Sequence, residues 1–184
     1  PFGGWSWAAA ALLAIGLFIQ LFVNHRESET TLPIAQITKL SGPLLWTGNG
    51  GQVNQNLQAG TKLSGGTIEG MGPDAWFELE FNDGSEVVIA GNSMLTISDL
   101  GQKELRLREG SFSANVMPQP KGKPMLVRTR SALFEVMGTR FSVDAELSSS
   151  TLTVSEGKVR ATRLSDGSTV EVAAKQRVVA ALDC

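Results

Sequence analysis

The sequence predicts an all-β domain, a compact antiparallel sandwich or jelly-roll-like arrangement, preceded by one transmembrane helix. Three observations support this class. From Ile37 onward, short runs alternate apolar and polar residues, which is the period of strands that bury one face. Clusters of Gly, Asn, Asp, Ser and Pro separate these runs, as expected for short strands joined by tight turns. Ahead of them, residues 1–24 contain no ionisable side chain.

Residues 1–26 are predicted to be the transmembrane helix with its flanks. The apolar run from Trp5 to Val23 has about the length needed to cross the hydrocarbon of a bilayer. The alternatives are a buried core helix and a signal-peptide core. A β domain offers no site for a helix that is apolar all round, and no Ala-x-Ala cleavage pattern follows Val23. We therefore expect membrane lipid around residues 5–23.

The remaining chain divides into a linker and one domain. Residues 27–36 are polar and contain Pro33, and we expect them to be a tether. The β domain is predicted at residues 37–180, and residues 181–184 are expected to begin a C-terminal region that follows this sequence. Because the chain starts with Pro rather than Met, we expect it to be a fragment of a longer protein.

The alternation is clearest in WFELEF, residues 76–81. Phe77, Leu79 and Phe81 are expected to point into the core, with the intervening glutamates in solvent. An Asp-Gly turn follows, which is a strong hairpin signal. Further strands are predicted within residues 86–90, 104–116, 125–145 and 150–180, with a proline-rich connection at 117–124.

The stretch EVMGTRFSVD, residues 135–144, changes the parity of its apolar residues. Phe134 and Val136 occupy even positions, whereas Phe141 and Val143 occupy odd positions. One face of a strand stays buried across such a change only if the strand gains a residue. Since glycine supplies the backbone angles of a bulge, we expect a bent strand with a bulge at Gly138. Residues 125–145 as a whole are expected to form a long strand pair or a bent strand.

A weak internal similarity links residues 40–63 to residues 155–178. Gly42 and Gly157 are each followed two residues later by an apolar residue, and each copy then reaches a turn and a second strand. A duplication explains this similarity, and so do two hairpins with the same turn chemistry. We favour the hairpins and do not predict a solenoid.

Composition excludes several function classes. A net charge of −2 gives no electrostatic basis for nucleic-acid binding. With one Cys and one His, zinc sites built from these residues lack ligands. A Ser/His/Asp or Cys/His system would need its base at His25, beside the membrane. GNGG, residues 48–51, is not followed by Lys-Ser/Thr, so it is not a phosphate loop. We therefore expect no metal, no cofactor and no nucleic-acid partner. For Cys184 we favour the absence of a specific role over a structural thiol or a lipid or disulfide partner outside this sequence.

Catalysis is not expected either. Glu78 and Glu80 alternate on one predicted strand, so they face outward together as ordinary surface residues. Glu135, Asp144 and Glu146 form no constellation that the sequence reveals. We predict no catalytic residue.

In order and spacing, several segments resemble a FecR-type domain over about residues 37–180. The most recognisable segment ends in Gly-Thr-x-Phe-x-Val. The segments that carry the resemblance are 40–68, 75–95, 107–116, 127–143, 153–162 and 166–179. The residues that match the family pattern, which we expect to be structural, are Asp83, Gly84, Ser85, Gly110, Gly138, Thr139, Phe141, Val143, Glu156 and Gly157.

The resemblance implies a function in signalling. FecR-type proteins are single-span regulators of the bacterial inner membrane, and a cytoplasmic tail binds an extracytoplasmic-function sigma factor. Their β domain is periplasmic and receives a signal from an outer-membrane receptor or another envelope protein. The same arrangement is expected here, with the sigma-binding tail outside this sequence. Arg130 and Arg140, which flank Gly138, are candidate contacts, but we favour the interpretation that they are solvated strand positions.

The alternative function is a membrane-anchored structural or adhesive envelope module. The β domain would then be a spacer, and a ligand-binding domain C-terminal to this sequence would contact polysaccharide or protein. A helical N-terminal tail would favour signalling, whereas a large C-terminal module would favour adhesion.

Overall fold

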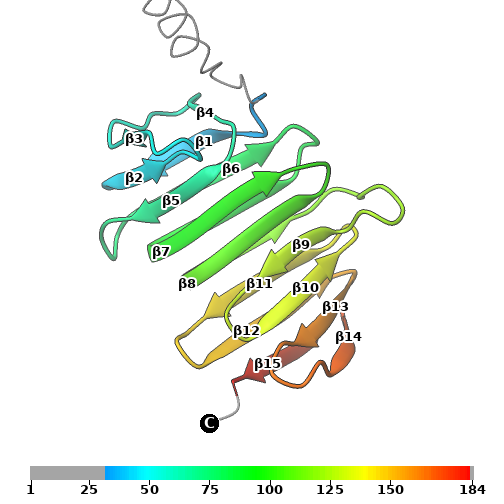
Figure 1. Cartoon of the computed structure of the whole chain (residues 1–184). Helices are drawn as coiled ribbons and strands as arrows, with labels where there is room; N and C mark the ends of the chain where they lie inside the picture. The colour runs from blue at the N-terminus through cyan, green and yellow to red at the C-terminus, as the bar shows by residue number, and fades with distance from the viewer. Residues whose placement is uncertain (1–31, 183–184) are drawn as a thin grey trace, which may run out of the picture. The chain divides into compact units, whose positions relative to one another are not determined.

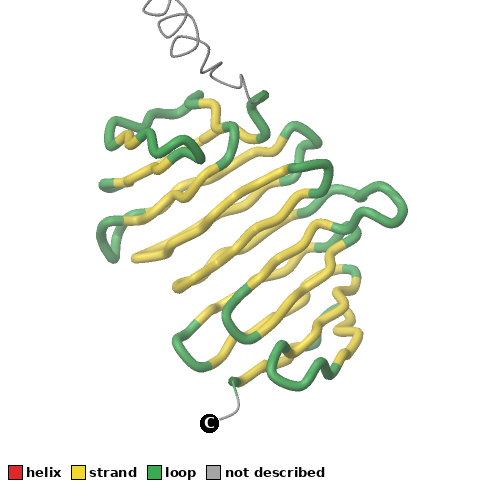
Figure 2. Tube along the Cα trace, viewed as in Figure 1, coloured by secondary structure: helices red, strands yellow, loops and turns green. Residues whose placement is uncertain are grey.

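The computed structural model describes residues 32–182, and within them every regular element is a β-strand (Figures 1 and 2). The expected all-β class is confirmed. No helix in residues 32–182 is long and apolar enough to cross a membrane, and the helix predicted at residues 1–26 lies outside the described residues. The strands are β1 (Ala35–Ser41), β2 (Leu44–Thr47), β3 (Val53–Asn54), β4 (Lys62–Leu63), β5 (Gly66–Gly70), β6 (Trp76–Phe81), β7 (Glu86–Asp99), β8 (Lys103–Asn115), β9 (Met125–Arg128), β10 (Ala132–Val136), β11 (Arg140–Ala145), β12 (Ser149–Glu156), β13 (Lys158–Arg163), β14 (Thr169–Ala173) and β15 (Arg177–Ala181).

The strands form one hydrogen-bonded sheet that folds over into two layers (Figure 1). The long strands β7 and β8 run through both layers. The start of β7 pairs with β6 and its end with β5, while the start of β8 pairs with β9 and its end with β11. The first layer therefore has the order β3-β2-β5-β7-β8-β9-β10-β13-β14. The second has the order β4-β1-β6-β7-β8-β11-β12-β15.

One detail of the predicted architecture, the purely antiparallel pairing of its strands, is wrong. The domain is not purely antiparallel, because β8 and β9 pair in parallel, with Leu105 opposite Val127. A parallel pair needs a crossover connection, and residues 116–124 supply it by leading from the second layer back to the first. The two layers are joined in one mixed sheet, because β7 and β8 run through both.

A single hydrophobic core lies between the layers. Phe77, Leu79 and Phe81 are each at most 2% exposed, so the inward face predicted for β6 is confirmed. The rings of Phe112 and Phe141 pack edge to face in this core, with centroids 5.9 Å apart. Such pairs add to the free energy of simple apolar burial.

Gly110 lies where β8 passes from the first layer to the second. Its φ is +96°, and a Cβ atom at this position would lie 2.1 Å from Ser93 Oγ on the adjacent bend of β7. Ser93 Oγ donates to the carbonyl of Ala90 and accepts from the amide of Ser111 at 3.1 Å. The two bends therefore pack directly on each other, with room for only a hydrogen atom at Gly110.

The bulged, bent strand predicted at Gly138 is wrong. β10 ends at Val136 and β11 begins at Arg140, and the two strands belong to different layers. Passing between layers reverses which side of the chain faces the core, so Val136 and Phe141 are both buried without an extra residue. The parity change therefore marks a crossover. The nearby bulge lies in β12, where Ser155 is skipped between the partners of Arg140 and Phe141.

The two segments with similar sequence close the two edges of the domain by the same path. In each, the chain leaves the second layer at a glycine, forms a hairpin in the first layer and returns to pair with the strand it left. The return turns also share a hydrogen bond: Gly60 N donates to Ile37 O and Lys175 N donates to Val154 O, each at 2.7 Å. The similarity therefore extends from the turn residues to the path of the chain.

Lys175 is a position where this shared path strains the chain. Its φ is +66°, and it is the only non-glycine residue with positive φ in residues 32–182. A left-handed backbone conformation costs an L-residue about 1–2 kcal/mol. Glycine at this position removes that cost, but part of the gain in stability is lost because glycine makes the unfolded chain more flexible. We expect Lys175→Gly to raise the free energy of unfolding by about 0.5–1 kcal/mol, measured by urea denaturation.

Gly60 provides the control for Lys175. It occupies the equivalent position with φ +90°, and no atom of the described residues lies within 4 Å of where its Cβ would be. The reciprocal change Gly60→Lys should lower the free energy of unfolding by a similar amount. A decrease in stability for Lys175→Gly would show that its side chain contributes more than its backbone costs.

Candidate functional site

Most of the predicted signature residues gather at one end of the domain. We call this group the signature cluster: Asp83, Gly84, Ser85, Gly138, Thr139, Glu156 and Gly157. It brings together turns that are up to about 75 positions apart in the chain. The other signature residues lie elsewhere, since Gly110 is at the opposite bend, and Phe141 and Val143 are in the core.

Asp83 organises one half of the signature cluster. Its Oδ2 accepts hydrogen bonds from Lys103 Nζ and Gln119 Nε2, both at 2.7 Å, and its Oδ1 accepts from the amide of Ser85 at 3.1 Å. Burial by itself would raise the pKa of Asp83, but these hydrogen bonds outweigh it and lower the pKa to about 2. The carboxylate thus holds the β6–β7 turn, the start of β8 and the crossover connection together.

The other half of the signature cluster joins the two crossings between layers. Thr139 Oγ1 donates to Lys158 O at 3.0 Å. A Cβ atom on Gly157 would lie 3.0 Å from Gly138 O, and one on Gly138 would lie 3.1 Å from Pro118 Cα. Both glycines have positive φ. The backbones around Gly138 and Gly157 therefore approach as closely as glycine permits. The hydrogen bond of the Thr139 side chain links these two segments.

Asp83→Asn is expected to lower the free energy of unfolding by about 1–2 kcal/mol at pH 7, allowing for solvent screening. Because the folded-state pKa of Asp83 is depressed, its contribution is complete above the unfolded pKa of about 4 and is lost as pH falls toward about 2. The difference between wild type and Asp83→Asn should therefore shrink between pH 5 and pH 2 in urea titrations. Asp74→Asn is the control, since Asp74 makes no ion pair or hydrogen bond among residues 32–182; an equal pH dependence for both variants would contradict this role.

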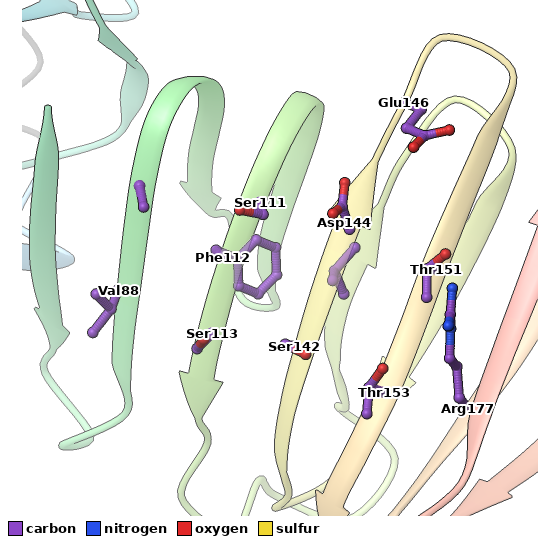
Figure 3. A pocket seen from close by; sticks show the side chains of 12 residues that line it. Val88, Ser111, Phe112, Ser113, Ser142, Asp144, Glu146, Thr151, Thr153 and Arg177 are labelled. Atoms are coloured by element: carbon purple, nitrogen blue, oxygen red, sulfur yellow. The ribbon is translucent and has the colours of Figure 1, made fainter. Parts of the chain in front are cut away.

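A polar groove of about 490 Å³ lies on the outer face of the second layer, over β8, β11 and β12 (Figure 3). Short hydroxyl side chains form its floor, which is why the sheet is hollow there. Val88 of β7 and Arg177 of β15 stand at its two sides (Figure 3). The floor residues are Ser111, Ser113, Ser142, Thr151 and Thr153.

Two charged groups of the groove have no partner within the described chain. Asp144 lies between Ser111 and Thr151 in the cross-strand register, and Arg177 lies opposite Thr153. Neither residue makes an ion pair or a side-chain hydrogen bond among residues 32–182. Glu146, at the rim, accepts a hydrogen bond from Ser149 Oγ at 3.1 Å. The groove thus offers hydroxyls that donate and accept, with a carboxylate and a guanidinium available to a ligand or partner.

The remaining predicted contacts are placed apart from one another. Arg130 lies in the turn before β10 and Arg140 follows that strand, so β10 separates them. Arg140 pairs with Glu156 at 3.0 Å on the surface, an interaction of the kind that contributes little to stability. Glu78 is held on the surface of the second layer by Thr38 and Lys39, as expected for an outward position.

Sequence reasoning missed several residues that act through distant partners. Lys103 and Gln119 bind Asp83 across 20 and 36 positions of the chain. A buried hydroxyl network joins Thr129, Ser131 and Ser150 through two hydrogen bonds of 2.8 Å. No local pattern marks these residues, because each is an ordinary polar residue beside a turn.

Comparisons with known proteins agree with this fold. A family model described as "FecR protein" matches residues 71–160. Two crystal structures of a "putative anti-sigma factor" from Parabacteroides distasonis ATCC 8503 are similar, with TM-scores of 0.55 and 0.54 at 22% and 23% identity. The alignments cover 62% and 60% of this chain and 54% and 52% of those chains. No curated protein matches the chain. The chain thus spans about half the length of these structures, and the likeness shows a shared fold.

Proposed function

The chain contains a FecR domain at residues 71–160, and on that premise we propose that it is a FecR-like transmembrane regulator of signal transduction. The β domain is periplasmic, the helix at residues 5–23 crosses the bacterial inner membrane, and a cytoplasmic tail outside this sequence controls an extracytoplasmic-function sigma factor. The family match is the observation that carries the proposal. The fold that the domain shares with structures described as anti-sigma factors supports it.

In this proposal the β domain acts as a binding module for an envelope protein, such as an outer-membrane receptor. The polar groove supports this role, because Asp144 and Arg177 are charged groups that no residue of the described chain compensates. Charged pairs across an interface favour one partner over others. A partner with a cation near Asp144 and an anion near Arg177 would satisfy both groups.

The test uses the full-length protein in its own organism. Deleting its gene should change transcription from promoters that depend on one extracytoplasmic-function sigma factor, and the tagged protein should retain that sigma factor on purification. Unchanged transcription together with no retained sigma factor would contradict the regulatory function and favour the anchored adhesive module.

Charge reversals in the groove test the role of the β domain. Asp144→Lys and Arg177→Glu should abolish the response to the envelope signal while sigma-factor retention stays intact. Arg108→Glu, on the outer face of the first layer, is the matched control and should leave the response unchanged. Equal effects at all three positions would show that the groove is not the receiving surface.

A further inference from the structure

The end of the domain formed by β14 and β15 has open strand edges. Among the described strands, β15 pairs only with β12 and β14 only with β13. Each is five residues long, whereas β3 and β4 at the other end have two residues each. A gap of about 210 Å³ lies beside them, lined by apolar residues such as Val170 and Val178 and by polar residues such as Thr162 and Thr169. Long unpaired edges of this kind accept another strand.

The backbone groups of β15 alternate between β12 and the open edge. Gln176 O accepts from Val154 N, and Leu182 N donates to Ser148 O at 2.8 Å. Because bonded and non-bonded pairs alternate in an antiparallel ladder, the even-numbered residues of β15 bond to β12. The N–H and C=O groups of Arg177, Val179 and Ala181 therefore face the open edge.

We propose that β15 pairs with β15 of a second copy of this chain, antiparallel and centred on Val179. In this register Val179 lies opposite the partner's Val179, and Arg177 lies opposite the partner's Ala181. All three residues with outward backbone groups then form hydrogen bonds across the interface. The register is also favourable for side chains, because the valines meet each other, the long arginine meets a small residue, and no like charges are opposed.

The side chains of the two edges favour pairing of two copies through β15 rather than through β14. Val179 is 54% exposed and carries no charge, although it is central to its strand. The hydrogen bond from Arg163 N to Ser168 O shows that the even-numbered residues of β14 bond to β13. The central residue whose backbone groups face the open edge is therefore Glu171. Two copies paired there would oppose glutamates, a charge placement that protects edges. The inference concerns assembly alone and does not depend on the proposed regulatory function.

Cysteine cross-linking of the complete chain tests the register. In a Cys184→Ser background, Val179→Cys is expected to form a disulfide-linked dimer under mild oxidation. Directly opposed residues of a bonded pair have Cα atoms about 5.5 Å apart, which suits a disulfide. Arg177→Cys alone should not cross-link, since its counterpart lies about 13 Å along the strand. The double variant Arg177→Cys with Ala181→Cys should cross-link.

A second variant tests the pairing without cysteine. Val179→Pro removes an N–H that faces the open edge, so it costs no bond to β12, and the dimer dissociation constant should rise at least tenfold by analytical ultracentrifugation with the circular dichroism unchanged. If proline unfolds the chain, Val179→Lys serves instead, because it would oppose two lysines. A monomeric wild-type chain, cross-linking through Glu171→Cys in place of position 179, or capture of a different protein by Cys at 179 would each overturn the proposal.

Discussion

Gly110→Ala is expected to lower the free energy of unfolding by about 2–5 kcal/mol. The new methyl carbon would lie 2.1 Å from Ser93 Oγ, 2.6 Å from Ser93 Cβ and 2.7 Å from Ser93 Cα. Rotation of the Ser93 side chain cannot relieve this clash, because the backbone Cα atom of Ser93 is also too close. The φ of +96° adds conformational strain to the clash. Urea denaturation followed by circular dichroism measures the effect.

Gly101→Ala separates the clash from the strain. Gly101 has a similar φ of +89°, and no atom of residues 32–182 lies within 4 Å of the position of its Cβ. Only the conformational cost applies there, so the loss should be about 1–2 kcal/mol. Equal losses at the two glycines would mean that the bends of β7 and β8 separate easily, and the close packing at Ser93 would then contribute nothing to stability.

Phe141→Ala is expected to lower the free energy of unfolding by about 3–5 kcal/mol. Phe141 is 2% exposed, and its strand lies between β8 and β12 in the second layer. Truncation removes the edge-to-face contact with Phe112 and leaves a cavity in a close-packed core. The expected result is a lower urea midpoint with an unchanged slope, measured on the complete chain.

Val88→Ala provides the comparison for Phe141. Val88 is 38% exposed on the outer face of β7, so its truncation should cost about 0.5 kcal/mol. A loss below about 1 kcal/mol for Phe141→Ala would show that the core relaxes around the missing ring. In that case the face of β11 that the parity pattern marks as buried would contribute little to the free energy of unfolding.

The groove and the signature cluster differ in how far the sequence could predict them. Asp83 and Gly84 were recognisable from their turn chemistry, and Gly138, Thr139 and Gly157 from the family pattern. That these turns meet at the connection between β8 and β9 was not predictable, because Lys103 and Gln119 reach Asp83 only after β8 has folded over. Asp144 was visible only as an isolated carboxylate, since Ser111 and Arg177 join it through the strand register.

By itself, the sequence determined the all-β class, the inward face of strands such as β6, and the turn at Asp83-Gly84. These features follow from alternation and from backbone preferences that act over a few residues. Only the tertiary structure decided that β7 and β8 bend through both layers, that β9 pairs in parallel with β8, and that the chain crosses between layers at Gly138. The physical reason is that alternation specifies which face of a strand is buried but does not specify which other strand pairs with it. A bulged strand and a crossover produce the same change of parity, and the choice between them depends on packing against distant residues such as Pro118 and Gly157.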